Sequence, residues 1–190
     1  MDGVTKEGYG LELEANLADL SGRLKRMGYH PQPKRRSYIP KAGSEKGRPL
    51  GISCFEDKLV ELAVKRVLEP IYEEQFEDSS YGYRPQHSQH QCLAKLGEAI
   101  QQKRLNHVVE ADITSFFNKV NHDWMLKFLR HRIGAPRILK LIARMLKGGI
   151  LEDGLIQAAP KKGHRKDQSF HRCCRTSTCT AYWTFGSVGG

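Results

Sequence analysis

The chain has 190 residues and a mass of 21.6 kDa, the size of one modest domain, and is too short for a multidomain enzyme. Apolar residues make up 39% and charged residues 27% of the composition, which excludes collagen-like and fully disordered chains. Lys and Arg total 31 against 21 Asp and Glu, so the formal net charge of +10 favours a polyanionic partner such as nucleic acid.

The positive charge is divided between two parts of the chain. Six basic side chains and one acid give +5 to residues 161–190, which leaves the other +5 for residues 1–160. We therefore expect a positive surface that is spread out rather than concentrated. No apolar run reaches the length of a membrane helix and no secretory signal opens the chain, so we expect a cytoplasmic protein with no membrane contact and reduced thiols.

The first third of the chain predicts a helix followed by a hairpin. Leucines at close to helical spacing predict an amphipathic helix over 11–27 that ends at Gly28. Two extended segments, 38–41 and 49–53, flank a basic link at 42–48, whose glycines indicate a hairpin turn. The tip of this hairpin would be exposed and positive.

Two helices and a loop are predicted next. Apolar residues cover much of a helix circumference over 57–68, and Pro70 stands where that helix should stop or kink. After a Tyr-rich loop at 79–85, Ser88 can cap a second helix. We expect that helix to turn its apolar residues inward: Cys92, Leu93, Leu96, Ala99 and Ile100.

The remaining elements complete an α+β pattern. Residues 107–113 give the strongest strand signal in the chain, so we predict a strand there. Helices are predicted at about 121–132 and 136–147, with Trp124 on the apolar side of the first. After about Pro160 no periodicity remains, and Cys, Ser and Thr become frequent.

Local chemistry leaves several alternatives open. Asp112 at a strand end is either a metal-binding carboxylate or an acid that caps a turn, because one acid is not a two-metal site. Lys41 and Arg48 in the hairpin either bind phosphates or are merely solvated. Arg84, beside Tyr81, either binds single-stranded nucleic acid or is merely solvated. The Cys and His residues of the tail lack the paired spacing of a zinc site.

The order of short motifs resembles the N-terminal part of group II intron-encoded reverse transcriptases, also called intron maturases. Blocks of this kind in one order, from residue 38 to residue 117, are far more specific than any single motif. The blocks are Tyr38–Lys41, Gly47–Ile52, Glu56–Val60, Val67–Glu73, Ser80–Pro85, Ser88 with His90, and Glu110–Ile113 through Phe116–Phe117.

The resemblance implies an incomplete right-hand polymerase fold. Residues 1–105 look like an N-terminal extension and fingers, 106–155 like a partial palm, and 156–190 like an aberrant, disordered tail. By position, Asp112 matches the first catalytic aspartate, and Asp112 with Ile113 would bind Mg²⁺. Phe117 matches the residue under the incoming sugar.

The same resemblance assigns partners. Lys41 and Arg48 are similar to residues that hold the dNTP triphosphate, and the implied partners are intron RNA, an RNA template, a DNA primer and dNTP. Asn118 and Asn121 stand where the family usually has aspartates. The family's Tyr-x-Asp-Asp block supplies the other metal-binding aspartates, and this chain has no Asp-Asp pair.

The tail has a specific interpretation. If each codon is read one nucleotide earlier, the genetic code lets residues 160–179 encode Glu-Glu-Gly-Thr-Pro-Gln-Gly-Ser-Val-Ile-Ser-Pro-Leu-Leu-Ser-Asn-Ile-Tyr-Leu. That string is what the family carries after its fingers and palm helices. We therefore hypothesise that the tail after about residue 155–160 is a frameshifted translation.

Three functional hypotheses follow. The first is a truncated group II intron reverse transcriptase, whose parent class adds dNTPs to a primer on an RNA template with Mg²⁺ and assists splicing. This chain alone should not polymerise, because phosphate clamping needs the full set of carboxylates. The second is a non-catalytic fragment that binds intron RNA, and the third is a pseudogene product without function.

Overall fold

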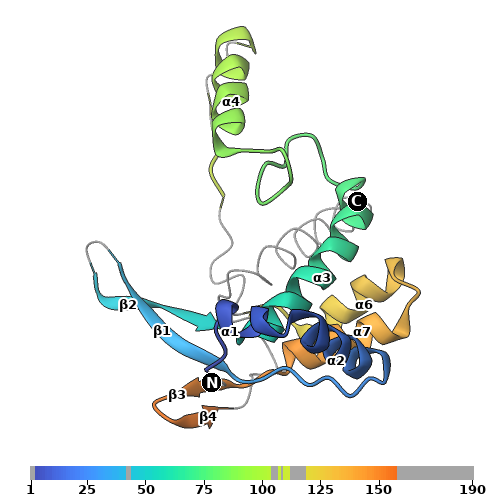
Figure 1. Ribbon diagram of the computed structural model, residues 1–190. Coiled ribbons are helices and arrows are strands. Elements are labelled where there is room, and N and C mark those ends of the chain that lie inside the picture. The colour runs from blue at the N-terminus through green and yellow to red at the C-terminus, as the bar shows by residue number, and fades with distance from the viewer. Residues whose placement is uncertain (1–2, 42–43, 104–106, 108, 112–118, 158–190) are drawn as a thin grey trace.

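The computed structural model describes residues 3–41, 44–103, 107, 109–111 and 119–157. Helices and a small sheet alternate along this part of the chain, which confirms the α+β class (Figure 1). The elements are α1 Lys6–Leu11, α2 Leu13–Lys25, β1 Lys34–Lys41, β2 Ser44–Ile52, α3 Phe55–Glu73, α4 Gln89–Lys103, α6 His122–Arg132, α7 Pro136–Leu146, β3 Ile150–Glu152 and β4 Leu155–Gln157.

A four-stranded sheet joins the hairpin to the end of the described chain. Its strand order is β2-β1-β3-β4, with β1 antiparallel to β2 and parallel to β3. The strands β3 and β4 are joined by Asp153 and Gly154, which have φ angles of 50° and 78°. Two successive positive φ angles at Asp-Gly are typical of a type I′ hairpin turn. This Asp-Gly signal was present in the sequence, but the two strands were not predicted.

The core lies where α3 packs against α2, α6 and α7. On α3, Val60, Val64 and Leu68 are buried at helical spacing, and Ile142 of α7 has no exposed surface. The apolar stripe of α7 begins directly after Pro136, whose fixed φ suits the first position of a helix. The predictions of helices near 121–132 and 136–147 are therefore confirmed.

The predicted N-terminal helix is split and then ends in an unusual turn. Glu12 separates α1 from α2, so the helix predicted over 11–27 is present only as α2. Met27 has a φ of 57°, and the Gly28 amide donates to the Arg23 carbonyl at 2.8 Å. This closing bond of a Schellman-type turn satisfies a carbonyl that the helix end would otherwise leave without a partner.

The hairpin and α3 are longer than predicted. Most of the predicted link at 42–48 belongs to β2, which begins at Ser44. Its basic residues Lys46 and Arg48 therefore lie in a β-strand and not in a long turn. Helix α3 continues through Pro70 to Glu73. Burial of one face of α3 stabilises the helix enough to tolerate the missing Pro70 donor, because packing rather than local propensity decides most helices in proteins.

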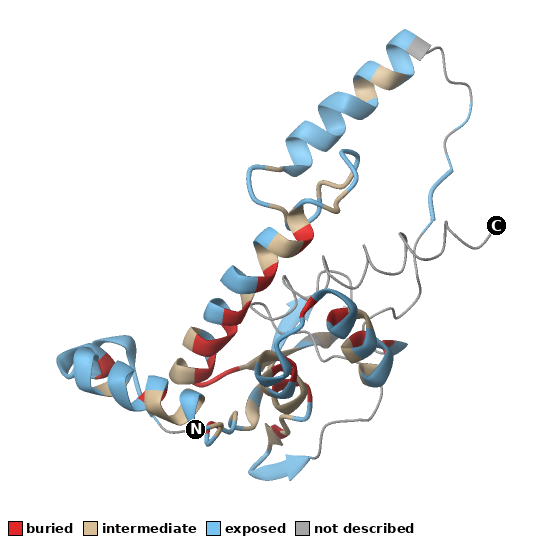
Figure 2. Ribbon diagram, turned by 90° about the vertical axis from the view of Figure 1, so that its right-hand side faces the viewer, coloured by how far each residue is buried: buried red, intermediate tan, exposed pale blue. Residues whose placement is uncertain are grey.

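Three further expectations are wrong. Helix α4 forms, but Leu93 and Leu96 are exposed, because no described element covers that face; Figure 1 shows α4 projecting from the body, and Figure 2 shows its exposed surface. The strand predicted over 107–113 is not formed at residues 107 and 109–111, where the described backbone pairs with no neighbouring strand. Trp124 is half exposed and does not join the core.

No helix within the described ranges is both long and apolar enough to cross a membrane. The predicted tail, 156–190, lies outside the described residues apart from its first two positions, which end β4.

Candidate nucleic-acid interface

The β1–β2 hairpin brings the two predicted triphosphate ligands to the same end of one ladder. Arg48 pairs with Ile39, and Lys41 pairs with Ser44 next to an irregularity in the register. The two positions therefore lie near the hairpin tip, and their shared role stays a prediction. Their side chains lie outside what the structure describes.

Close packing inside the hairpin depends on a glycine. A Cβ added at Gly47 would lie 3.0 Å from the Tyr38 Cβ, so only glycine fits there without a shift of the neighbouring strand. The Tyr38 hydroxyl donates to Glu152 of β3, and the Arg36 guanidinium lies 3.7 Å from the same carboxylate. Glu152 thus ties the middle of the hairpin to the neighbouring hairpin β3–β4.

Two buried acids hold the base of the hairpin against α3. Asp57 and Glu61 are each only 3% exposed. One Asp57 oxygen accepts a hydrogen bond from the Tyr29 hydroxyl, and the other accepts one from the backbone N–H of Gln32 at 3.0 Å. Buried carboxylates are costly unless they are fully paired, so this acid fixes the chain that enters β1. Burial, and then the hydrogen bond to Asp57, raise the pKa of Tyr29.

Glu61 lies one helical turn later and uses only one carboxylate oxygen, because its Oε2 is buried without a hydrogen-bond partner among the described residues. Its Oε1 lies 3.0 Å from the Lys34 ammonium and accepts the Ser53 hydroxyl at 3.0 Å. Lys34 begins β1, and Ser53 directly follows β2, so one carboxylate clamps both strands of the hairpin. We infer that the acids of this motif position the hairpin.

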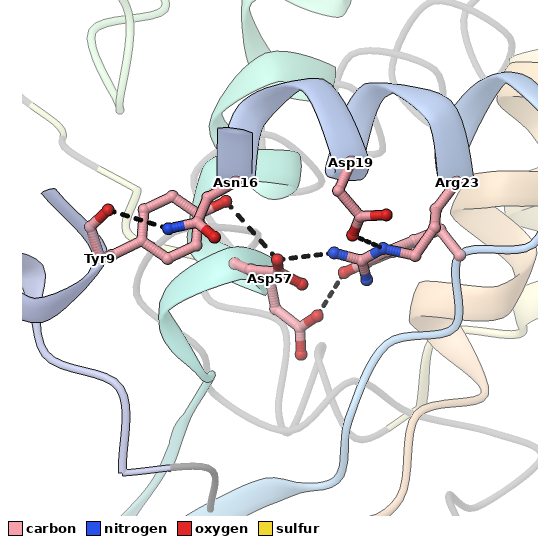
Figure 3. A network of polar contacts seen from close by, with 7 residues as sticks. Tyr9, Asn16, Asp19, Arg23 and Asp57 are labelled. Atoms are coloured by element: carbon pink, nitrogen blue, oxygen red, sulfur yellow. Dashed lines mark hydrogen bonds and ion pairs between the residues drawn. The ribbon is translucent and has the colours of Figure 1, made fainter. Parts of the chain in front are cut away.

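The N-terminal helices are tied to the same helix by a polar network (Figure 3). Arg23 of α2 lies 2.7 Å from Asp19 and 2.6 Å from Glu56, the residue before Asp57. The Asn16 amide donates to the Tyr9 carbonyl at 3.1 Å. The first turn of α3 therefore organises both the N-terminal helices and the hairpin.

In the Tyr-rich loop, the Arg84 side chain is used inside the protein. Its guanidinium donates to the Glu73 carboxylate at 2.8 and 2.9 Å and to the carbonyls of Glu77 and Ser80 at 2.8 and 3.0 Å. It also lies 5.0 Å from the centre of the Phe76 ring, and its side chain is only 7% exposed. These contacts compete with the phosphate binding predicted for Arg84, which stays a prediction.

Tyr81 lies in the same loop and contacts two neighbours. Its ring lies 5.7 Å from the His87 ring, and the Lys95 ammonium lies 5.8 Å from the Tyr81 ring centre. An aromatic ring beside a cation is typical of single-stranded nucleic-acid sites. The nucleic-acid role of Tyr81 likewise stays a prediction.

The predicted catalytic and metal-binding residues are not among the residues that the structure describes. Asp112, Ile113 and Phe117 lie outside the described residues. Among the residues that are described, no group of three His, Cys, Asp or Glu side chains could hold a metal ion. The described part of the chain therefore supports a positioned hairpin and does not itself contain a metal site.

Sequence reasoning missed Glu61 and Glu152 as positioning residues. Glu61 follows Asp57 by four residues and so lies on the same face of α3 as the buried Val60 and Val64. An acid on an apolar helix face is a usable signal for a buried partner. Glu152 offered no such signal, because its role depends on the parallel pairing of β3 with β1.

Comparison with known proteins decides the family. Residues 39–176 match the family described as reverse transcriptase (RNA-dependent DNA polymerase). The chain belongs to this family. Over 140 residues it is 40% identical to the group II intron-encoded protein LtrA of Lactococcus lactis subsp. cremoris, covering 74% of this chain and 23% of LtrA. These findings confirm the resemblance to the N-terminal part of group II intron reverse transcriptases.

Two further relatives agree. Protein YkfC of Escherichia coli K12 is 36% identical over 162 residues, covering 84% of this chain and 42% of YkfC. A chain of a partial Cas6-RT-Cas1–Cas2 complex superimposes with a TM-score of 0.57 at 22% identity, covering 93% of this chain and 30% of that chain. This likeness confirms a partial reverse transcriptase fold. The chain spans less than half the length of each of these relatives.

Proposed function

We propose that this chain forms the fingers and the start of the palm of a group II intron-encoded reverse transcriptase, and that it binds RNA but adds no nucleotides on its own. The observation that carries the proposal is the β1–β2 hairpin, clamped at its base by Asp57 and Glu61 and carrying Lys41 and Arg48 near its tip. The identity to LtrA and the matched order of motifs support it.

The residues near the hairpin tip have a direct electrostatic role in this proposal. A dNTP triphosphate and an RNA backbone are both strongly anionic, and Arg and Lys offer charge-assisted hydrogen bonds to phosphate oxygens. Lys41 and Arg48 hold the triphosphate, and Phe117 contacts the incoming sugar. The buried carboxylates support this by fixing the direction of the two strands.

Nucleotide addition needs more than the hairpin. Polymerases of this class use two metal ions to stabilise the attacking and leaving oxygens, and several carboxylates must hold those ions. Mg²⁺ is the metal expected of the family, and Asp112 with Ile113 is where we propose it binds. One aspartate is too few, and the chain contains no Asp-Asp pair. The described residues do not supply the missing ligands, so we assign no reaction step to a bound metal.

Primer extension tests the catalytic half of the proposal. The purified chain is incubated with poly(rA)/oligo(dT), dTTP and Mg²⁺, beside a complete group II intron reverse transcriptase as the positive control. We expect no extension above background by the chain and full extension by the control. Robust incorporation that is lost in Asp112→Asn would show that the chain polymerises, and the proposal would be wrong.

A gene product without function is the second candidate, and the shifted reading of residues 160–179 favours it. Its test is the nucleotide sequence of the gene. If the shifted frame continues downstream into codons for the Tyr-x-Asp-Asp block, the frameshift hypothesis is supported. If that frame is closed by stop codons, or if the tail is encoded in the frame of its relatives, the hypothesis is wrong.

A further inference from the structure

Helix α7 carries a row of basic residues on one side. At 3.6 residues per turn, spacings of three, four and three residues keep four side chains within one narrow arc of the helix. Three of them are exposed and the third in order is half-buried, and they are Arg137, Lys140, Arg144 and Lys147. We call these four residues the α7 basic stripe. By helix rise, the stripe is about 15 Å long.

The surrounding sequence contains no compensating acid. Residues 124–151 include no Asp or Glu but seven Lys or Arg: Lys127, Arg130, Arg132, Arg137, Lys140, Arg144 and Lys147. Within residues 1–160 the positive charge is therefore concentrated here, contrary to the expectation that it is spread out. An acid-free basic segment on the outer sides of two helices is typical of a surface that binds a polyanion.

An apolar pocket opens beside the stripe. It has a volume of about 260 Å³ and lies between α7 and the left-handed turn after α2. Its apolar side chains come from both elements, and no acidic residue lines it; the lining residues are Leu24, Lys25, Met27, Tyr29, Arg137, Ile138, Leu141 and Arg144.

The stripe also shapes the pocket. The Arg144 guanidinium donates to the carbonyls of Met27 and Tyr29 at 2.5 and 2.9 Å, and Arg137 donates to the Lys25 carbonyl. These bonds hold the turn in place as one wall of the pocket. Lys25 lines the pocket and is exposed, and Lys140 and Lys147 of the stripe are exposed as well, so their ammonium groups can contact an anion.

The small size of the pocket next to this row of cations fits one ligand class better than another. A bound peptide helix needs a groove with several anchor sites at helical spacing, whereas this pocket has room for one flat apolar group. A single-stranded nucleic acid presents unstacked bases and a regular row of phosphates. The base would enter the pocket and the flanking phosphates would lie along the stripe.

We propose that the α7 basic stripe and its pocket form a second RNA-binding site, which takes one unpaired base of a single strand together with its phosphates. This inference rests on the proposed RNA binding but concerns a face built from α2 and α7, separate from the β1–β2 hairpin. The Lys140 and Lys147 ammonium groups contact phosphate, and the pocket receives the base.

Salt-dependent binding of a labelled 12-nucleotide oligo(U) to the full chain tests the stripe. Each phosphate contact lowers the logarithmic salt slope by about 0.7 for a single strand. Lys140→Gln with Lys147→Gln should therefore make the slope shallower by about 1.4 and weaken binding by roughly 10- to 30-fold at 0.1 M salt. The matched control, Lys6→Gln with Lys58→Gln, removes the same charge from exposed positions on α1 and α3 and should change binding less than about threefold.

A 12-mer of abasic nucleotides tests the pocket. It keeps the phosphates, so its salt slope should match that of oligo(U), but it should bind at least about tenfold more weakly because stacking and burial of a base are lost. Ile138→Trp fills the pocket from its wall and should remove this difference between the two oligomers.

Each outcome is decisive. If the stripe variant binds oligo(U) as tightly as its control does, the site is wrong while the proposed RNA binding survives. If the unsubstituted chain binds no RNA at all, both proposals fail. Equal binding of the abasic and base-containing oligomers would overturn the base pocket. If an acidic peptide of the same net charge as oligo(U) displaces it while abasic and base-containing oligomers bind equally, that result would assign the face to a protein partner instead.

Discussion

Helices α3 and α4 have similar amphipathic sequences but opposite environments. On α3 the apolar face is buried and even its two acids, Asp57 and Glu61, are enclosed and paired. On α4 the apolar face is exposed, with Leu93 at 64%. The contrast teaches that periodicity specifies a face, whereas burial depends on what the rest of the protein supplies.

The largest expected effect is on the free energy of unfolding, when the same Leu→Ala substitution is made on each of the two helices. Leu68→Ala on α3 should lower the free energy of unfolding by about 3 kcal/mol, because it leaves a cavity in the core. Leu93→Ala on α4 should change it by less than about 0.5 kcal/mol. Urea denaturation followed by circular dichroism measures both. Equal losses would mean that α4 is covered in solution, and the comparison would fail.

The buried acids give the next effect. Asp57→Ala leaves the Tyr29 hydroxyl and the Gln32 amide without an acceptor, and unsatisfied buried donors cost about 2–3 kcal/mol in total. Glu77→Ala, in the exposed loop after α3, is the control and should be nearly neutral. A stability of Asp57→Ala equal to that of the control would show that the hairpin base is not held by this acid.

The Arg84 contacts should matter locally. Arg84→Lys keeps the charge but loses the planar fork, and we expect a loss of about 1–2 kcal/mol with faster hydrogen exchange in residues 78–88. Exchange in α3 should stay unchanged. Arg66→Lys on the exposed side of α3 is the control. Unchanged exchange in the loop, together with weaker RNA binding, would instead assign Arg84 to the nucleic acid.

The smallest effect is at alkaline pH. Because the folded state raises the pKa of Tyr29, the folded protein keeps this proton to a higher pH than the unfolded chain does. Stability should therefore be constant below about pH 10 and fall above it as the unfolded chain releases the proton. Tyr29→Phe should reduce this fall, and Tyr83→Phe should not. A fall of the same size in Tyr29→Phe would refute the assignment.

The sequence predicted well where local signals and packing agree. Helix α7 was placed correctly from the helical spacing of its apolar residues Ile138, Leu141, Ile142 and Met145, and Pro136 at its first position favours the same start. The hairpin and the family were found because short motifs occur in a fixed order. Non-local pairing was not predictable in the same way: β3 is only three residues long and exists through its parallel pairing with β1.

The site residues stay a prediction, and the structure adds contacts that the sequence did not show. Lys41 and Arg48 were singled out for their charge, and the backbone register now places them near one another. The position of Glu61 on an apolar helix face was a local signal for burial, but nothing local showed which residues it binds. Nor did anything local show that Arg84 is committed to Glu73. Such roles depend on contacts between elements that are distant in the chain, so they needed the structure.

Equilibrium binding of a poly(rA)/oligo(dT) duplex to the purified chain tests the central claim most directly. Arg48→Ala removes one phosphate contact near the hairpin tip, and the account predicts binding about fivefold weaker at 0.1 M salt with a shallower salt slope. Arg66→Ala, on α3, is the control and should bind like the unsubstituted chain. Equal binding by both variants, or no binding by the unsubstituted chain at moderate salt, would contradict a nucleic-acid-binding role for the hairpin.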